Sequence, residues 1–228
     1  MDQEIGEKIA KFYDLFNSDK NHRYKSWEHC YKYFRFDNTM FESDKACLHL
    51  AFYLASWGMY RGSSPLLQKD YLIHMEVVEE LWNLENKKYL QNLDFTIIDD
   101  NDITSIIGLM EKIKKIYSKH KVENKVVSAS DTLVTKILLG TLGCIPAYDR
   151  FFIRGLKQCS ISPKNNPSKK SIKSVINFYK EHKHEFDKIE KYIEISNGSN
   201  VIYPPMKLID MYFWQIGYES QSNQLLIT

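Results

Sequence analysis

A short segment around Arg61 combines residue types that favour binding of an anion. Arg61 is followed by Gly62, Ser63, Ser64 and Pro65. A serine followed by proline is typical of a helix start, with Ser64 as N-cap and Pro65 at the first helical position. Free backbone amides, the positive end of a helix dipole and a guanidinium together bind phosphate or carboxylate well. The simpler alternative is that Ser64 only caps the helix and Arg61 pairs with a carboxylate.

A second candidate site lies between Lys136 and Arg150, where Gly140 and Gly143 indicate a tight turn between two apolar helices. The string 139–147 resembles the helix–hairpin–helix element of DNA-repair glycosylases. The matching positions are Leu139, Leu142, Gly143 and Ala147. The resemblance implies that the hairpin amides and the start of the next helix hold a DNA phosphate.

The same string departs from the family's pattern at several positions. Gly140 replaces a proline, Thr141 a glycine and Pro146 a threonine, and Ile145 stands where bifunctional members carry a catalytic lysine. No carboxylate follows Lys157 until position 181. Glycosylase chemistry is therefore not implied, whereas phosphate binding by the turn is. The alternative is an ordinary turn, with Asp149 paired to Arg150 or to Arg154.

The third candidate site is the pair Lys207 and Asp210 on a predicted C-terminal helix. Residues three apart share a helix face, so the two side chains can form an ion pair. They could also place a perturbed carboxyl beside a cleft, which is common in working sites. Bulky apolar neighbours favour the alternative of a helix docked on the core.

Helices must position all of these residues. The spacing of apolar residues predicts helices over 4–17, 26–36, 42–60, 64–82, 104–118, 130–139, 147–157, 171–192 and 206–216. We expect an all-α fold, a single orthogonal multi-helix domain over 1–228, with about 8–10 helices and little or no sheet. Residues 158–170, rich in proline, asparagine and serine, are expected to form a surface loop. The 42–60 helix is apolar nearly all round, which predicts a place at the centre of the core.

Composition excludes several classes of function. The 31 basic and 29 acidic residues give a net charge of +2, which argues against nucleic-acid binding by bulk charge alone. No cysteine, histidine or carboxylate pattern has metal-ligand spacing, and no P-loop or dinucleotide motif is present, so we expect neither metal nor cofactor. The four cysteines have the spacing of free thiols. No apolar stretch is long enough to span a bilayer. We therefore expect no membrane association and a cytoplasmic location.

Two functional hypotheses follow from these residues. In the first, the protein binds DNA or RNA through phosphate contacts at helix N-termini. Whether Arg61, Lys136, Arg150 and Lys157 line one groove is the observation that would best inform this hypothesis. In the second, a small enzyme or binder holds an anionic small molecule such as a nucleotide. Arg61 would then bind the anion, with Asp149 or Asp210 as polar partner. A protein-interaction subunit is a third alternative, and the oligomeric state is left open.

Overall fold

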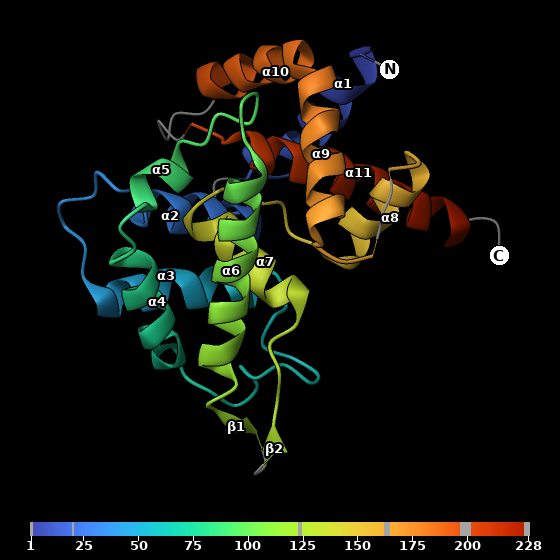
Figure 1. Ribbon diagram of the computed structural model, residues 1–228. Coiled ribbons are helices and arrows are strands. Elements are labelled where there is room, and N and C mark those ends of the chain that lie inside the picture. The colour runs from blue at the N-terminus through green and yellow to red at the C-terminus, as the bar shows by residue number, and fades with distance from the viewer. Residues whose placement is uncertain (1, 20, 123–124, 162–164, 197–201, 226–228) are drawn as a thin grey trace.

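The chain is folded almost entirely as helices in the computed structural model, which describes residues 2–19, 21–122, 125–161, 165–196 and 202–225 (Figure 1). Its α-helices are α1 (Asp2–Asn17), α2 (Ser26–Tyr33), α3 (Ser43–Ser56), α4 (Met75–Trp82), α5 (Lys87–Gln91), α6 (Asp100–Tyr117), α7 (Asp131–Thr141), α8 (Arg150–Gln158), α9 (Lys169–Glu181), α10 (Lys183–Ser196) and α11 (Pro205–Leu225). Two short 3-10 helices, η1 (Arg23–Lys25) and η2 (Tyr71–His74), precede α2 and α4. Within the described ranges the only sheet is one antiparallel pair, β1 (Lys121–Val122) with β2 (Lys125–Val126). The expected all-α single domain is confirmed.

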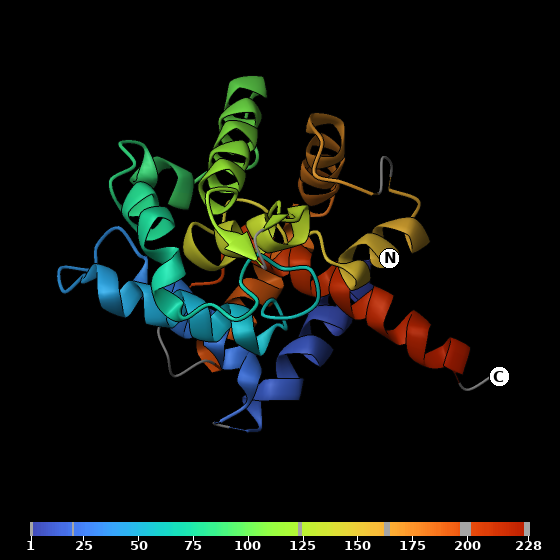
Figure 2. The same cartoon turned by 90° about the horizontal axis from the view of Figure 1, so that it is seen from below.

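The centre of the core is α7, which lies near the middle of Figures 1 and 2. Every residue of this helix from Leu133 to Thr141 is buried. Ser130 caps its first turn as predicted, since its Oγ accepts from the Leu133 N–H at 3.2 Å. The expectation that the 42–60 helix is central is wrong, because Leu48 and Phe52 of α3 are 45% and 60% exposed. The apolar residues of α3 therefore cover the core with one face only.

Two glycines let α8 and α11 cross in backbone contact. A Cβ on Gly155 would lie 2.0 Å from the Phe213 carbonyl oxygen, and one on Gly217 would lie 2.0 Å from that of Phe151. The predicted C-terminal helix 206–216 is too short, since α11 continues through Gly217 to Leu225. Here glycine provides room for a neighbouring helix instead of a helix end.

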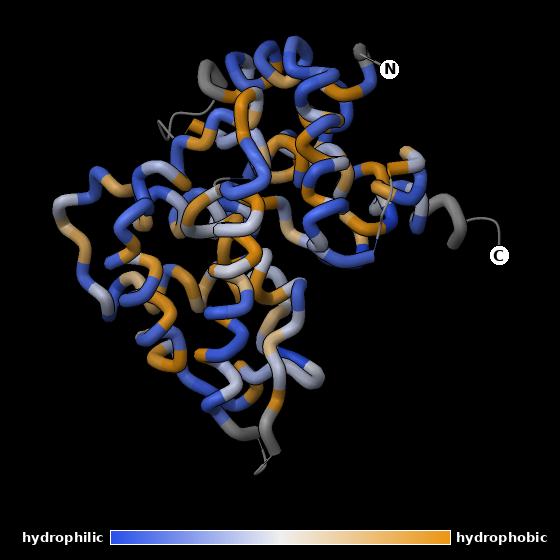
Figure 3. Tube along the Cα trace, in the orientation of Figure 1, coloured by the Kyte–Doolittle hydropathy of each residue, from blue (hydrophilic) through white to orange (hydrophobic). Residues whose placement is uncertain are grey.

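Other helix boundaries differ from the predicted ones for local reasons. The expected helix 171–192 is divided into α9 and α10 at His182, whose ring Nδ1 lies 2.9 Å from the Phe178 carbonyl oxygen. The predicted 104–118 helix begins earlier, because Asp99 and Asp102 form a capping box. Blue and orange segments alternate along α6, α9 and α10 in Figure 3, as expected for helices that turn one face to the core.

The expected surface loop 158–170 corresponds to the connection between α8 and α9. Residues 162–164 of this loop lie outside the described residues. In the described part of the chain, no helix combines the length and the apolar character that crossing a membrane requires. Cys30, Cys47, Cys144 and Cys159 are free thiols, as predicted.

Candidate anion-binding site

Four of the predicted site residues line one cleft of about 370 Å³. The cleft lies where the chain after α3, the start of η1, α7, the start of α8 and α11 meet. We call it the arginine cleft, and its lining residues are Arg23, Trp57, Gly58, Met59, Arg61, Thr132, Lys136, Asp149, Arg150, Phe151 and Trp214. Arg61, Lys136 and Arg150 thus share one groove, whereas Lys157 is not among its lining residues.

A smaller extension of about 190 Å³ adjoins the arginine cleft and shares Gly58, Met59, Arg61 and Thr132 with it. We call this extension the serine arm, because Ser63, Ser64, Ser128 and Ser130 line it. In Figure 2 the 57–70 segment crosses the underside of the molecule beside the start of α7. The two predicted serines and Arg61 therefore line the same small pocket, which borders the arginine cleft.

The expected helix start at Ser64 is absent, and turns occupy the chain up to residue 68. The Ser64 Oγ accepts from the Leu66 N–H at 3.2 Å, which closes a turn. Gln68 then has a φ of 59°, a left-handed conformation that a right-handed helix cannot contain. Residues 64–82 accordingly form turns, η2 and α4. No helix begins at Ser64, so this segment adds no helix dipole and contributes charge through the Arg61 side chain.

Three arginines of the cleft have no carboxylate partner. Arg23, Arg61 and Arg150 take part in none of the ion pairs among the described residues, and all three are exposed. One Arg23 Nη donates to the Ser56 carbonyl oxygen at 2.7 Å. Gly58 makes room for the Arg61 guanidinium, since a Cβ at Gly58 would lie 3.3 Å from its Cζ. Gly58 also has a φ of 73°, which glycine adopts without strain.

Lys136 and Asp149 form a nearly buried ion pair in the same cleft. Their Nζ–Oδ2 distance is 2.9 Å, and their side chains are 4% and 12% exposed. Asp149 also caps α8, because its Oδ1 accepts from the N–H groups of Phe151 and Phe152 at 3.0 Å each. A carboxylate of the protein thus already occupies the start of α8. The alternative pairing of Asp149 with Arg150 or Arg154 is wrong.

Lys207 and Asp210 form the predicted i, i+3 ion pair, at 3.3 Å, but behind the cleft and not in its lining. Both residues are at least 96% buried. Burial lowers the pKa of Lys207 and raises that of Asp210, while each charge partly offsets this effect on the other. The Lys207 ammonium also lies 5.1 Å from the ring centroid of Trp27. The pair belongs to the core.

The string 139–147 forms the end of α7 and the connection to α8, and all of it is buried. Gly140 lies inside α7 against Tyr53, and Gly143 ends the helix with a φ of 66°. The Gly143 N–H donates to the Leu138 carbonyl oxygen at 2.9 Å. The Ala147 N–H donates to Asp210 Oδ1 at 3.0 Å. This arrangement engages these amides within the protein and favours a structural role for them.

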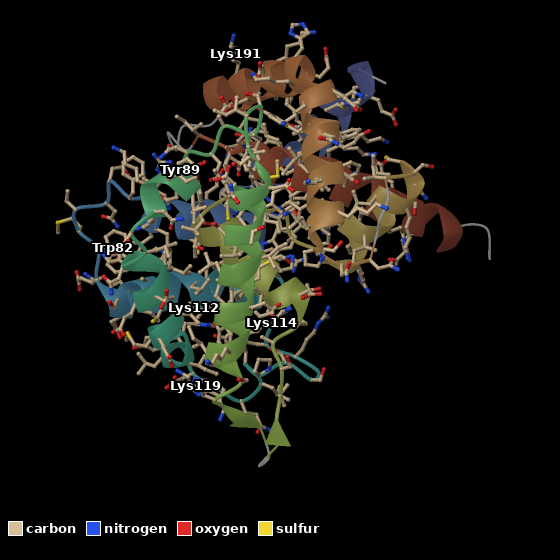
Figure 4. The ribbon with its side chains drawn as sticks, viewed as in Figure 1. Trp82, Tyr89, Lys112, Lys114, Lys119 and Lys191 are labelled. Atoms are coloured by element: carbon tan, nitrogen blue, oxygen red, sulfur yellow. The ribbon has the colours of Figure 1, made fainter. Side chains whose placement is uncertain are left out.

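Three lysines elsewhere on the surface differ from the cleft arginines, because carboxylates pair with them. Figure 4 labels Lys112, Lys114 and Lys119 along α6 and the turn that follows it. Lys112 pairs with Glu80 at 2.6 Å, Lys114 with Asp131 at 2.8 Å, and Lys119 with Glu76. These three cations are therefore neutralised locally.

Sequence reasoning missed Arg23 and the aromatic walls formed by Trp57, Phe151 and Trp214. Arg23 lies in a polar break that carries no local motif, and only the tertiary fold brings it to the cleft. Among the described residues, no three His, Cys, Asp or Glu side chains gather as metal ligands would. Comparisons of the chain with protein-family models, with curated proteins and with solved structures found no match.

Proposed function

We propose that the arginine cleft binds the phosphate of a nucleotide unit, either as a free nucleotide or as one residue of a nucleic acid strand. The observation that carries the proposal is the convergence of Arg23, Arg61 and Arg150, none of them paired with a carboxylate. Guanidinium groups bind phosphate oxygens through paired, charge-assisted hydrogen bonds. Four cations and one carboxylate line the cleft, which leaves an excess of positive charge for a phosphate.

The aromatic lining supports a ligand that also carries a planar group. Trp57, Phe151 and Trp214 lie among the arginines. Bases stack on aromatic side chains and on guanidinium planes with little sequence preference. The cleft volume of about 370 Å³ falls in the range of small-molecule sites.

The phosphate contacts in this proposal come from side chains and not from helix N-termini. Asp149 already accepts from the first amides of α8, and a second anion there would meet its charge. The Lys136 ammonium balances Asp149 at the floor of the cleft. The three arginines therefore stay available for an external anion.

A nucleic acid strand as the source of the nucleotide is favoured by the serine arm. It continues the cleft beyond Arg61 and adds the hydroxyls of Ser63 and Ser128. Hydroxyl groups commonly contact phosphates without reading sequence. A neighbouring phosphate of a strand would lie there, whereas a mononucleotide would leave the arm empty.

Fluorescence anisotropy with two probes tests the proposal and separates the sources. One probe is a labelled single-stranded DNA 12-mer and the other a fluorescent adenosine monophosphate, each titrated at low and at moderate salt. Removing one charged phosphate contact costs about 1.5–3 kcal/mol, so Arg61→Ala should weaken binding about tenfold or more. Lys119→Ala, which removes a carboxylate-paired cation outside the cleft, is the matched control and should change nothing.

The pattern of binding decides between the sources. Tight, salt-dependent binding of the 12-mer with weak binding of the mononucleotide indicates a strand, and comparable affinities indicate a free nucleotide. If neither probe binds at low salt, or if Arg61→Ala and Lys119→Ala weaken binding equally, the proposal is wrong.

A further inference from the structure

A second cleft, of about 530 Å³, lies between α2 and α3 and shares no lining residue with the arginine cleft. We call it the histidine cleft. Its lining residues are His29, Tyr31, Lys32, Tyr33, Arg35, Asp37, Asn38, His49 and Ile202. They come from α2, the loop after it, α3 and the chain before α11.

Local hydrogen bonds fix one wall of the histidine cleft. The Tyr33 hydroxyl accepts from the Glu42 N–H at 3.0 Å, and its ring stacks on His49 with 4.3 Å between centroids. The Asn38 side chain donates to the Tyr33 carbonyl oxygen at 2.8 Å and accepts from the Met40 N–H at 2.9 Å. These bonds hold the loop and the ring in place before any ligand arrives.

Among the described residues, none of the four cationic or potentially cationic groups of this cleft lies within hydrogen-bond distance of a carboxylate. No hydrogen bond within the described residues involves the imidazoles of His29 or His49, and no ion pair there involves Lys32. Arg35 Nε lies 3.7 Å from Asp37 Oδ1, beyond normal hydrogen-bond length. The Arg35 guanidinium also interacts with the Tyr31 hydroxyl and lies 4.8 Å from the ring centroid of Phe36. The cleft thus carries donors that the protein itself does not use.

The charge of the cleft can rise to match its ligand. Lys32 and Arg35 against Asp37 leave one net positive charge, and each imidazole can add one more. Burial, and then the neighbouring His29, lower the pKa of His49. An oxyanion beside His49 would favour its protonated form, so binding would take up a proton. Such a site suits a dianion better than a monoanionic carboxylate.

We propose that the histidine cleft binds the phosphate group of a small phosphomonoester, held by Lys32, Arg35 and the His49 imidazole. His29 completes the ring of donors at the exposed side of the cleft. The apolar Ile202 and the ring of Tyr33 contact the organic part of the ester. This site is independent of the arginine cleft, since no residue is common to both.

NMR of the histidine ring C–H groups in the full chain tests this proposal with sulfate and with phenyl phosphate. Sulfate is a dianion throughout the range used, so its binding reports protein protonation alone. Sodium chloride keeps the ionic strength constant. We expect the signals of His29 and His49 to shift with one saturable curve. Lys32→Ala should weaken binding of both probes about tenfold, and Arg61→Ala in the other cleft should leave it unchanged.

The pH dependence of sulfate binding is a second readout. The titratable or charged groups that share the cleft with His49 are His29, Tyr31, Lys32, Tyr33, Arg35 and Asp37. Imidazole is the side-chain group whose charge generally changes between pH 7.5 and 5.5. Sulfate affinity should therefore rise about fivefold or more over that range, and His49→Gln should remove most of the rise.

Several results would overturn the proposal. Histidine shifts that grow linearly without saturation would show no site. Equal losses in Lys32→Ala and Arg61→Ala would show general screening. Failure of both probes here, with nucleotide binding intact in the arginine cleft, would refute this inference and leave the proposed function standing.

Discussion

The segment 61–65 and the α7–α8 connection, residues 142–149, both place glycines beside polar or charged residues between helices, yet they use their polar atoms differently. In the α7–α8 connection, buried amides donate to the Leu138 carbonyl and to Asp210. In the segment 61–65, Arg61 and Ser63 are exposed and have no hydrogen bond from their side chains to any described residue. In the connection the polar groups stabilise the fold, whereas in the segment 61–65 they remain available for the ligand that we propose.

This difference shows that the availability of polar atoms is a better guide to a binding site than residue type. Removing the partner of a buried, hydrogen-bonded polar group lowers the free energy of unfolding substantially, whereas replacing an unpaired exposed group changes it little. Substitutions in the connection should therefore reduce stability, whereas those around Arg61 should reduce binding.

The largest effect on stability is expected from Asp210→Ala. The change leaves the Lys207 ammonium buried without its carboxylate and the Ala147 N–H without its acceptor. Breaking such a pair from one side costs about 3–5 kcal/mol of unfolding free energy. Urea unfolding measures the loss, with Arg61→Ala as the control that should stay within about 0.5 kcal/mol of wild type. If Asp210→Ala and Arg61→Ala had equal unfolding free energies, the proposed difference between the structural connection and the segment 61–65 would be wrong.

A matched glycine pair sharpens the same contrast. Gly143 and Gly62 have similar left-handed φ values, 66° and 60°. A Cβ on Gly143 would lie 2.6 Å from Pro204 Cγ, whereas one on Gly62 would have nothing within 4 Å. Both substitutions to alanine carry the left-handed penalty of about 1–2 kcal/mol, and Gly143→Ala adds about 1–3 kcal/mol of overpacking. Equilibrium unfolding of both variants that gave equal losses would contradict the tight packing of the connection.

Acid should lower the free energy of unfolding through His74, a buried residue that contacts Tyr60 just before the segment 61–65. The buried His74 ring lies between two tyrosine hydroxyls, at 2.8 Å from that of Tyr60 and 2.6 Å from that of Tyr117. Burial lowers the pKa of His74 to about 3. In the unfolded chain His74 binds a proton near pH 6.5, whereas in the folded chain it stays neutral down to much lower pH. The contribution of His74 to stability is therefore complete above pH 6.5 and decreases as the pH falls below that value. The expected loss is up to about 1.4 kcal/mol per pH unit.

Unfolding free energies measured between pH 6.5 and 5 check this slope. The variant His74→Gln should lose the His74 contribution to the slope, while His184→Gln, at an exposed position, should keep it. An unchanged slope in His74→Gln would assign the acid sensitivity to other groups.

The sequence was informative where local chemistry decides the structure. Ser130 caps α7 and Lys207 pairs with Asp210, because cap and i, i+3 contacts depend on near neighbours. The predicted helix start at Ser64 is wrong, because the turn that begins there ends at Gln68, whose backbone is left-handed. It also missed Arg23, which only packing of η1 beside α3 brings to Arg61 and Arg150. Lys136 and Asp149 line the arginine cleft and Ser63 and Ser64 line the serine arm, so tertiary packing brings two separate candidate segments near each other.

The most direct test of the account follows arginine side chains and backbone amides by NMR during one titration with adenosine monophosphate. We expect the Nε–H signals of Arg23, Arg61 and Arg150 to shift together with a single dissociation constant. The amides of Gly143 and Ala147 should stay unchanged, because the protein already occupies them. Shifts of those amides with unmoved arginine signals would contradict the account and assign phosphate binding to the α7–α8 connection.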